Sequence, residues 1–226
     1  MAGTVDGKYY QVVAAHSLTE RLVIRARDRI YADFLACTRP GPEDEILDVG
    51  VSDVAGEAPN VLERLYPRRE RITAVGLGTA EAFQAEFPEV RYRQIAPGAP
   101  LPFADSHFAI ATANAVLEHV GGIAAQAAFM AELHRVARRV FVSVPHRYFP
   151  VEHHTALPLA HYLDATFGPA CRLIGKGEWA RTENLILMSR RRLRAACPPG
   201  TRPRIGFTGL RLGVFSSNIF AYWEKT

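Results

Sequence analysis

The sequence has few cysteines and no long apolar run, and both absences narrow the classes of protein that it can encode. Its 226 residues include three cysteines, Cys37, Cys171 and Cys197, which are far apart and odd in number. They form neither a zinc-type spacing nor a disulfide framework, so we expect a reducing, cytoplasmic location. No stretch approaches the roughly 18 uninterrupted apolar residues of a spanning helix, and the first residues lack the apolar centre of a signal peptide.

A strong charge of one sign is also missing. The formal net charge is +4, and 48% of the residues are hydrophobic against 22% charged, so the chain can bury a core. This mild basic balance permits anionic partners but does not demand nucleic acid. The arginine-rich run over residues 189–197 lacks interleaved aromatics, and we interpret it as a solvated helix face. We therefore expect no nucleic-acid partner.

The chain does contain alternating helix-like and strand-like segments. Apolar spacing predicts a first helix over residues 17–38, with Ser17 and Glu20 as a capping box. Short apolar runs predict strands over residues 45–50, 71–78, 89–95, 107–114 and 139–145, with a helix over 126–138 before the last of them. Two further runs, 203–213 and 214–225, predict a hairpin turning at Gly213. The alternation predicts an α/β fold with a doubly wound, mainly parallel seven-stranded sheet and a C-terminal hairpin.

We expect one domain over residues 1–226. Residues 1–40 form an N-terminal helical segment in this interpretation. Residues 145–170 are rich in proline, histidine and aromatics, which is typical of an irregular insertion, and we interpret them as a lid over the site.

The end of the first predicted strand, "LDVGVSD", is the first candidate for ligand binding. In a doubly wound sheet, ligands bind beyond the carboxyl ends of the strands. Gly50 would let the backbone turn tightly and expose its N–H groups, and Asp48 could accept hydrogen bonds from a ligand amine. A plain strand end with an aspartate turn explains the same residues.

Several motifs together are more specific. "ILDVG", "ITAVGL", "LPFADSHFAIATANAVLEHV" and "RVFVSVP" follow one another in the order found in class I S-adenosylmethionine-dependent methyltransferases, which the chain resembles over most of its length. It looks closest to the methyltransferase type 11 group, in a bacterial branch whose later segment is similar to "PHRYFPVEHHTALPLAHYL" here (Pro145 to Leu163). The resemblance implies a Rossmann-like fold, S-adenosyl-L-methionine as cofactor, and methylation of an oxygen or nitrogen of a small molecule or glycan-like intermediate.

The resemblance also assigns site residues. It places the donor's amino acid end against Asp48 and Gly50, and the adenosine near Leu77 and Phe103. The complete set assigned to donor binding is Asp48, Gly50, Asp53, Leu77, Gly78, Phe103 and Asn114. Glu118 and His119 are the catalytic candidates: an imidazole can accept a proton near neutral pH, and Glu118 could orient it. The alternative is that Glu118 caps a turn while His119 packs as a partly buried ring.

The chain departs from the family pattern at two donor anchors. Gly78 stands where the family commonly has an acid that binds the ribose, and Pro97 stands where an aspartate contacts the adenine. Asp53 and Glu81 are close enough in sequence to substitute. Since a lost charged hydrogen bond costs about 1.5–3 kcal/mol, the departures favour an alternative function, a non-catalytic binding or partner module with weakened donor binding.

The histidine-rich segment is the candidate substrate region. Its polar side chains could contact an anionic or sugar substrate or simply anchor the lid; they are His146, Arg147, Tyr148, Glu152 and His154. Glu152 and His154 could also be metal ligands, but the spacing in this segment matches no standard zinc pattern such as H-E-x-x-H. The sequence therefore predicts no metal site.

Overall fold

The strands form one seven-stranded sheet in the computed structural model, which describes residues 18–54, 56 and 59–225. The strands are β1 (Ile46–Val49), β2 (Ile72–Gly76), β3 (Arg91–Gln94), β4 (Phe108–Asn114), β5 (Ala137–Pro145), β6 (Arg204–Leu212) and β7 (Phe215–Glu224). Their order is β3-β2-β1-β4-β5-β7-β6. The first five are parallel, whereas β7 pairs antiparallel with both β5 and β6. The predicted doubly wound sheet with a C-terminal hairpin is confirmed.

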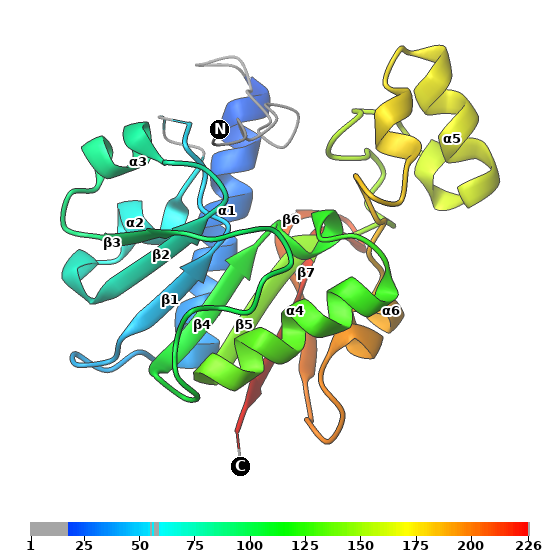
Figure 1. Cartoon of the computed structure of the whole chain (residues 1–226). Coiled ribbons are helices and arrows are strands. Elements are labelled where there is room, and N and C mark those ends of the chain that lie inside the picture. Colours follow the sequence, from blue (N-terminus) through cyan, green and yellow to red (C-terminus); the bar gives the residue numbers. More distant parts are fainter. Residues whose placement is uncertain (1–17, 55, 57–58, 226) are drawn as a thin grey trace.

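Helices cover the two faces of the sheet (Figure 1). Helices α1 (Leu18–Thr38), α2 (Val61–Leu65) and α3 (Glu81–Glu86) pack on one face, and α4 (Ile123–Val136) and α6 (Arg190–Ala196) pack on the other. Successive side chains of a strand point to opposite faces. Ile46 therefore packs in the core under α1, α2 and α3, and Leu47 packs in the core under α4 and α6. The proposed helix cap at Ser17 lies outside the described residues.

The boundary between α4 and β5 differs from the prediction. The helix ends at Val136 rather than near residue 138, because Ala137 already pairs with Phe108 at the start of the β4–β5 ladder. Helix α6 agrees closely with its predicted bounds, and the Ser189 side chain caps it by accepting a hydrogen bond from the Arg192 N–H.

The connection between β3 and β4, residues 95–107, contains no helix. Arg135 on α4 holds this loop by donating to the carbonyl oxygens of Leu101 and Phe103, each at 2.8 Å. Part of one sheet face is therefore open. The cleft there has a volume of about 520 Å³ and is lined by Glu45, Thr73, Arg91, Tyr92, Arg93, Phe103 and His107.

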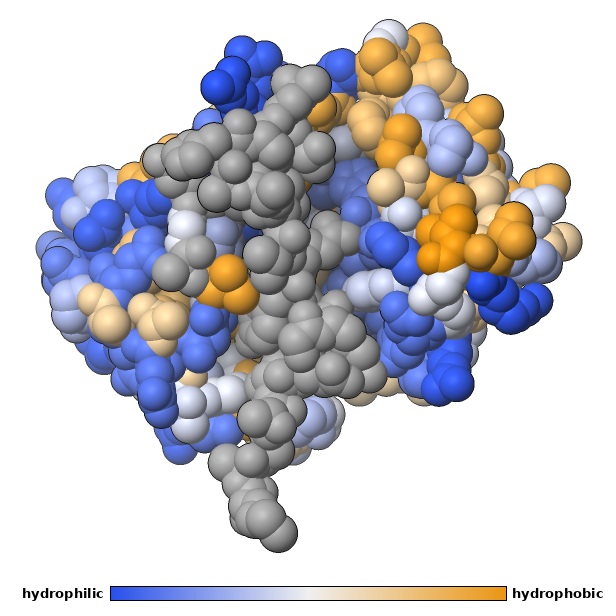
Figure 2. Space-filling model, turned by 90° about the horizontal axis from the view of Figure 1, so that it is seen from above, coloured by the Kyte–Doolittle hydropathy of each residue, from blue (hydrophilic) through white to orange (hydrophobic). Residues whose placement is uncertain are grey.

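Residues 146–188, here called the cap, lie between β5 and α6 and include α5 (Asp164–Leu173). The cap stands beyond the carboxyl ends of the strands (Figure 1). It extends past the predicted limit of residue 170, because Trp179 and Leu185 pack with Phe167 and Cys171 to complete a small apolar cluster of its own. Exposed apolar side chains gather on its surface (Figure 2), namely Leu159, Leu163, Leu173 and Ile174. Within the described part of the chain, no helix combines the length and apolarity that crossing a membrane requires.

Candidate active site

The turn after β1 brings the glycine of "LDVG" against the segment that follows β4. Gly50 has a φ of +94°, and a Cβ built there would lie 2.3 Å from Cγ2 of Val116. Only glycine suits both the backbone conformation and this close approach. The Gly50 N–H donates to the Val75 carbonyl oxygen at 2.8 Å. This corrects the expectation that the turn offers that N–H to a ligand.

Asp48, on β1, lies in a buried carboxyl pair that the sequence did not reveal. Its partner is Glu63 on α2, a residue with no exposed surface. Burial raises the pKa of Asp48 to about 7, while burial and the neighbouring Asp48 raise the pKa of Glu63 well above its ordinary value. Two buried carboxyls in contact cannot both ionise readily. At neutral pH, the pair therefore keeps at least one proton.

Asp53 and Asn114 are both engaged by the chain itself. Oδ1 of Asp53 accepts the Phe83 N–H at 3.0 Å and so holds the first turn of α3. Oδ1 of Asn114, at the end of β4, accepts a hydrogen bond from the Ser143 hydroxyl. Both residues lie by the carboxyl edge of the sheet, as predicted, but these contacts fix neighbouring elements.

Leu77 and Gly78 follow β2 directly. The Leu77 side chain is 40% exposed, and its carbonyl oxygen accepts from the Gln94 amide at 2.8 Å. The Gly78 carbonyl oxygen accepts from the Tyr92 hydroxyl at 2.5 Å. Leu77 therefore offers an apolar surface at the strand end, and position 78 offers only backbone.

The assignment of Phe103 to the adenosine is corrected by its position. Its ring contacts Phe108 with centroids 4.8 Å apart, and Phe108 is the first residue of β4. Phe103 also lines the open cleft, together with residues from the amino ends of β2 and β3. The loop over residues 95–107 has no helix and runs back along the sheet face, so it carries this ring to the opposite edge from the carboxyl ends.

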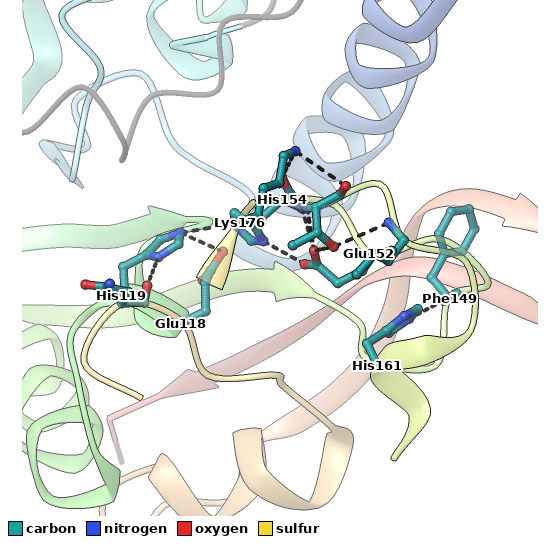
Figure 3. Close-up of polar contacts among 10 residues, drawn as sticks. Glu118, His119, Phe149, Glu152, His154, His161 and Lys176 are labelled. Atoms are coloured by element: carbon teal, nitrogen blue, oxygen red, sulfur yellow. Dashed lines mark hydrogen bonds and ion pairs between the residues drawn. The ribbon is translucent and has the colours of Figure 1, made fainter. Parts of the chain in front are cut away.

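The two catalytic candidates meet residues of the cap. Glu118 and His119 lie on a single 3₁₀ turn, η3 (Leu117–His119), directly after β4. Glu152 and His154 approach from the cap (Figure 3). Nε2 of His119 lies 3.2 Å from Nε2 of His154, and Nδ1 of His154 lies 2.8 Å from Oε1 of Glu152. The structure thus brings together two predicted catalytic residues and two predicted substrate residues.

His119 is oriented by a residue that the sequence did not indicate. Nδ1 of its ring lies 2.7 Å from the carbonyl oxygen of Asn184, whereas Oε1 of Glu118 is 3.9 Å from Nε2, beyond hydrogen-bond distance. The expectation that Glu118 orients the ring is therefore replaced by the Asn184 carbonyl. A backbone carbonyl 65 residues away in sequence leaves no mark in a sequence pattern.

The carboxyl groups of Glu118 and Glu152 have opposite environments although both are buried. Burial raises the pKa of Glu118 to about 7, and neither of its oxygens accepts a hydrogen bond. Burial also opposes the charge of Glu152, but hydrogen bonds from His154 and Thr155 outweigh it and lower its pKa to about 2. Burial, followed by the nearby His154, lowers the pKa of His119 to about 4. Its imidazole is neutral at pH 7.

The remaining predicted substrate residues act within the described structure as anchors. Nδ1 of His146 lies 3.3 Å from the Ser216 carbonyl oxygen. Arg147 donates to Asp164 at 2.8 Å and to carbonyl oxygens of residues 161 and 162. The Tyr148 side chain is half-exposed, and its carbonyl oxygen accepts from Tyr162. The sequence allowed two roles for these three residues, contact with a substrate or anchoring of the lid. Anchoring of the cap accounts for the contacts seen here.

Comparison with known proteins bears on the fold that carries these residues. Residues 47–140 match the family model of the methyltransferase domain. Among solved structures, magnesium protoporphyrin IX methyltransferase from Synechocystis PCC 6803, with bound S-adenosylhomocysteine, is 12% identical, with a TM-score of 0.56 over 97% of this chain and 91% of that one. The N-methyltransferase NodS from Bradyrhizobium japonicum, in complex with S-adenosyl-L-homocysteine, is 9% identical, with a TM-score of 0.55 over 88% and 86%.

A third similar structure is geranyl diphosphate C-methyltransferase from Streptomyces coelicolor, 17% identical, with a TM-score of 0.54 over 95% of this chain and 86% of that one. No curated protein matches the chain. The resemblance seen in the sequence is confirmed: the chain has the class I methyltransferase fold. Within that fold, residues 47–140 are the part that is similar to the methyltransferase domain family.

Proposed function

We propose that the chain is an S-adenosylmethionine-dependent methyltransferase acting on an oxygen or nitrogen of a small molecule or glycan-like intermediate. The observation that carries the proposal is the contact between the Gly50 turn and Val116. It joins the donor motif after β1 to the turn that presents Glu118 and His119 after β4. The methyltransferase-domain match, and fold neighbours crystallised with S-adenosylhomocysteine, support the same donor.

The proposed reaction is an in-line displacement at the donor methyl. A lone pair of the acceptor oxygen or nitrogen forms the new bond to carbon, the sulfur–methyl bond breaks, and sulfur keeps that electron pair. S-adenosylhomocysteine leaves, and the acceptor releases one proton. The protein supplies orientation and exclusion of water. In this proposal, Asp48 faces the donor's ammonium group, Leu77 contacts the adenosine, and Asn114 borders the methionine moiety.

The acceptor is proposed to enter between the cap and η3, beside Glu152 and His154. The general-base role of His119 stays a prediction, and the geometry sets a condition on it. One ring nitrogen is next to the Asn184 carbonyl and the other is 3.2 Å from His154. An acceptor hydroxyl reaching Nε2 must therefore displace the His154 ring.

Calorimetric titration with S-adenosylhomocysteine tests the donor site. We expect measurable binding by the wild type, weakening of about tenfold or more in Asp48→Asn, and no change in Glu89→Gln, a matched loss of charge at an exposed position. Transfer of a labelled methyl group to a panel of hydroxylated and amino-sugar compounds then tests catalysis. Absence of donor binding would contradict the proposal, and binding without transfer to any acceptor would favour the non-catalytic alternative.

A further inference from the structure

Ligand atoms of three side chains converge at one point between η3 and the cap. We propose that Glu118, His119 and His154 bind one divalent transition-metal ion of the zinc type, leaving a fourth coordination position open. One potential ligand atom from each residue lies within 4.8 Å of the other two. The sequence predicted no metal because its spacing fits no zinc motif. The ligands come from two segments that only the fold brings together.

The two imidazole rings turn their Nε2 atoms toward each other. Nδ1 of His119 is beside the Asn184 carbonyl oxygen, and Nδ1 of His154 is beside the Glu152 carboxylate. Each Nδ1 must carry hydrogen to donate to these oxygens, so each ring in its neutral form presents a lone pair at Nε2. These atoms face one another at 3.2 Å. Either a proton or a metal ion must lie between them.

The spacing suits a metal ion. With zinc–nitrogen bonds of about 2.0–2.1 Å, two ligands of a tetrahedral site are separated by about 3.3–3.4 Å. The observed Nε2–Nε2 distance of 3.2 Å is close to this value. The rings therefore need little rearrangement to coordinate.

Glu118 distinguishes a metal ion from a shared proton. Its side chain is 1% exposed, neither oxygen accepts a hydrogen bond, and Oε1 is 3.9 Å from Nε2 of His119. A proton held between the imidazoles would give this buried carboxyl only the long 3.9 Å ion pair and no hydrogen bond, which leaves much of its burial cost uncompensated. A metal ion gives it a direct ligand role after a modest swing of the carboxylate. The same ion would relieve the repulsion between the two Nε2 lone pairs and offset the cost of burying the Glu118 carboxyl.

The surroundings supply the outer contacts that metal-bound histidines require. Such histidines donate their second N–H to a carboxylate or a carbonyl, which fixes the ring. Glu152 serves His154 and Asn184 serves His119. Glu152 is itself fixed, since it accepts hydrogen bonds from the Thr155 N–H at 2.6 Å and hydroxyl at 2.7 Å.

Two imidazoles and a carboxylate suit zinc, manganese or iron better than magnesium. Three protein ligands with an open position are typical of catalytic rather than structural zinc. An acceptor hydroxyl or amine bound there would lose its proton more readily. This role of the ion rests on the proposed methyl transfer, whereas binding of the ion does not.

Tryptophan fluorescence offers a direct readout of binding. The chain has two tryptophans; the Trp179 ring lies 4.8 Å from the ring of His154 and 6.0 Å from that of His119. In a Trp223→Phe background, the full-length, tag-free, chelator-treated chain is titrated with Co²⁺ and then with Zn²⁺ as competitor. We expect quenching that saturates at one ion per chain, a visible absorption band of tetrahedral cobalt, and reversal of both by zinc.

Matched variants locate the site. We expect metal affinity to fall at least about 100-fold in His154→Ala and Glu118→Gln, and about 10- to 100-fold in Glu152→Gln, a loss typical of outer-contact residues. His107→Ala removes an exposed histidine and should leave affinity unchanged. Circular dichroism checks folding, and Glu118→Gln preserves shape if the histidine variants do not fold. Absence of one-to-one binding, or wild-type affinity in both Glu118→Gln and His154→Ala, would overturn the site. Metal binding without methyl transfer would leave the site standing and refute only the proposed function.

Discussion

Two regions of the molecule differ in how their polar groups are paired. One is the proposed donor side, around the ends of β1 and β2, and the other is the cluster of Glu118, His119 and His154 under the cap. Around β1 and β2, the turn groups bond within the chain: the Gly50 N–H to Val75, Asp53 to Phe83, and the Gly78 carbonyl to Tyr92. The buried Glu63 carboxyl is the exception on this side. Under the cap, by contrast, the Glu118 carboxyl accepts no hydrogen bond, and two imidazoles face each other.

The difference indicates where each half obtains its specificity. The donor side is shaped by backbone turns and apolar surface, so a donor would bind there mainly by fit, with Asp48 as the charged contact. The cluster under the cap is shaped by side chains from distant segments, which is how fixed chemistry is usually positioned. Variants that damage one half and spare the other test this division.

The largest expected effect is on turnover, from His119→Ala and His154→Ala. If both bind one metal ion, each should lower kcat by about 10²–10⁴-fold, and the double variant should lose little more, because residues acting as a unit are not additive. Affinity for S-adenosylhomocysteine should change little. A general base at His119 alone would instead leave His154→Ala much more active. Steady-state kinetics and calorimetry separate the two outcomes, with His107→Ala as control.

On the donor side, Gly50→Ala should strongly destabilise the protein. The positive φ costs about 1–2 kcal/mol for a residue with a Cβ, and the clash with Val116 adds about 1–3 kcal/mol of overpacking. Urea unfolding measures the total. Adding Val116→Ala should recover the steric part alone. A loss under about 0.5 kcal/mol in Gly50→Ala would mean that the turn can relax without cost.

Removal of the proposed metal ion should lower the melting temperature of the protein. Zinc at 100 times its dissociation constant stabilises the folded state by about 2.7 kcal/mol, which corresponds to about 5–10 °C in Tm for a chain of this size. Differential scanning calorimetry with zinc and with a chelator gives the shift. Glu118→Gln should show a much smaller one, and an equal shift in that variant would indicate binding elsewhere.

The Asp48–Glu63 pair should make stability fall as pH rises. Asp48 has an unfolded pKa near 3.9 and a folded pKa of about 7, so the folded state holds more protons between these values. Its contribution is complete below about pH 4 and is lost as pH rises through about 7. We expect the wild type to lose roughly 2 kcal/mol of unfolding free energy between pH 5.5 and 8 from Asp48, and a further amount because the folded state also keeps the proton of Glu63.

Glu63→Gln should reduce that pH dependence, because the amide cannot ionise and so removes the raised pKa of Glu63 from the difference between the folded and unfolded states. Urea unfolding at the two pH values checks it, with Glu89→Gln as the exposed control. Identical pH dependence in wild type and Glu63→Gln would show that the pair does not hold the proton.

The smallest expected effect is a gain. Gly78→Asp restores an acid after β2 and should tighten S-adenosylhomocysteine binding by about tenfold, equivalent to 1.4 kcal/mol. Gly78→Asn adds a side chain of similar size without charge and should gain less. Equal affinities for the two variants would argue that position 78 does not face the ribose.

The sheet and its helices could be predicted because buried strands and amphipathic helices leave periodic patterns in sequence. Asp48, Gly50, Glu118 and His119 could be placed at one edge because parallel strands end together. The position of Phe103 could not be predicted, because the loop that carries it has no helix or strand and therefore no periodic pattern in the sequence. Glu63 resembles an ordinary helix charge, and the Asn184 carbonyl belongs to the backbone, so neither contact has a sequence signal.

The hydrogen bond from the Ile186 N–H to the Glu118 carbonyl oxygen, 2.8 Å long, has a consequence for the order of events during synthesis. The ends of β1, β2 and β4 are all made by residue 114. The turn at Glu118 gains its last partners only when residues 184–186 leave the ribosome. Until then the residues that bury the Glu118 side chain in the folded protein are not all present, so its carboxylate stays in contact with water. The strand ends of the proposed donor site are thus synthesised before the residues that enclose Glu118.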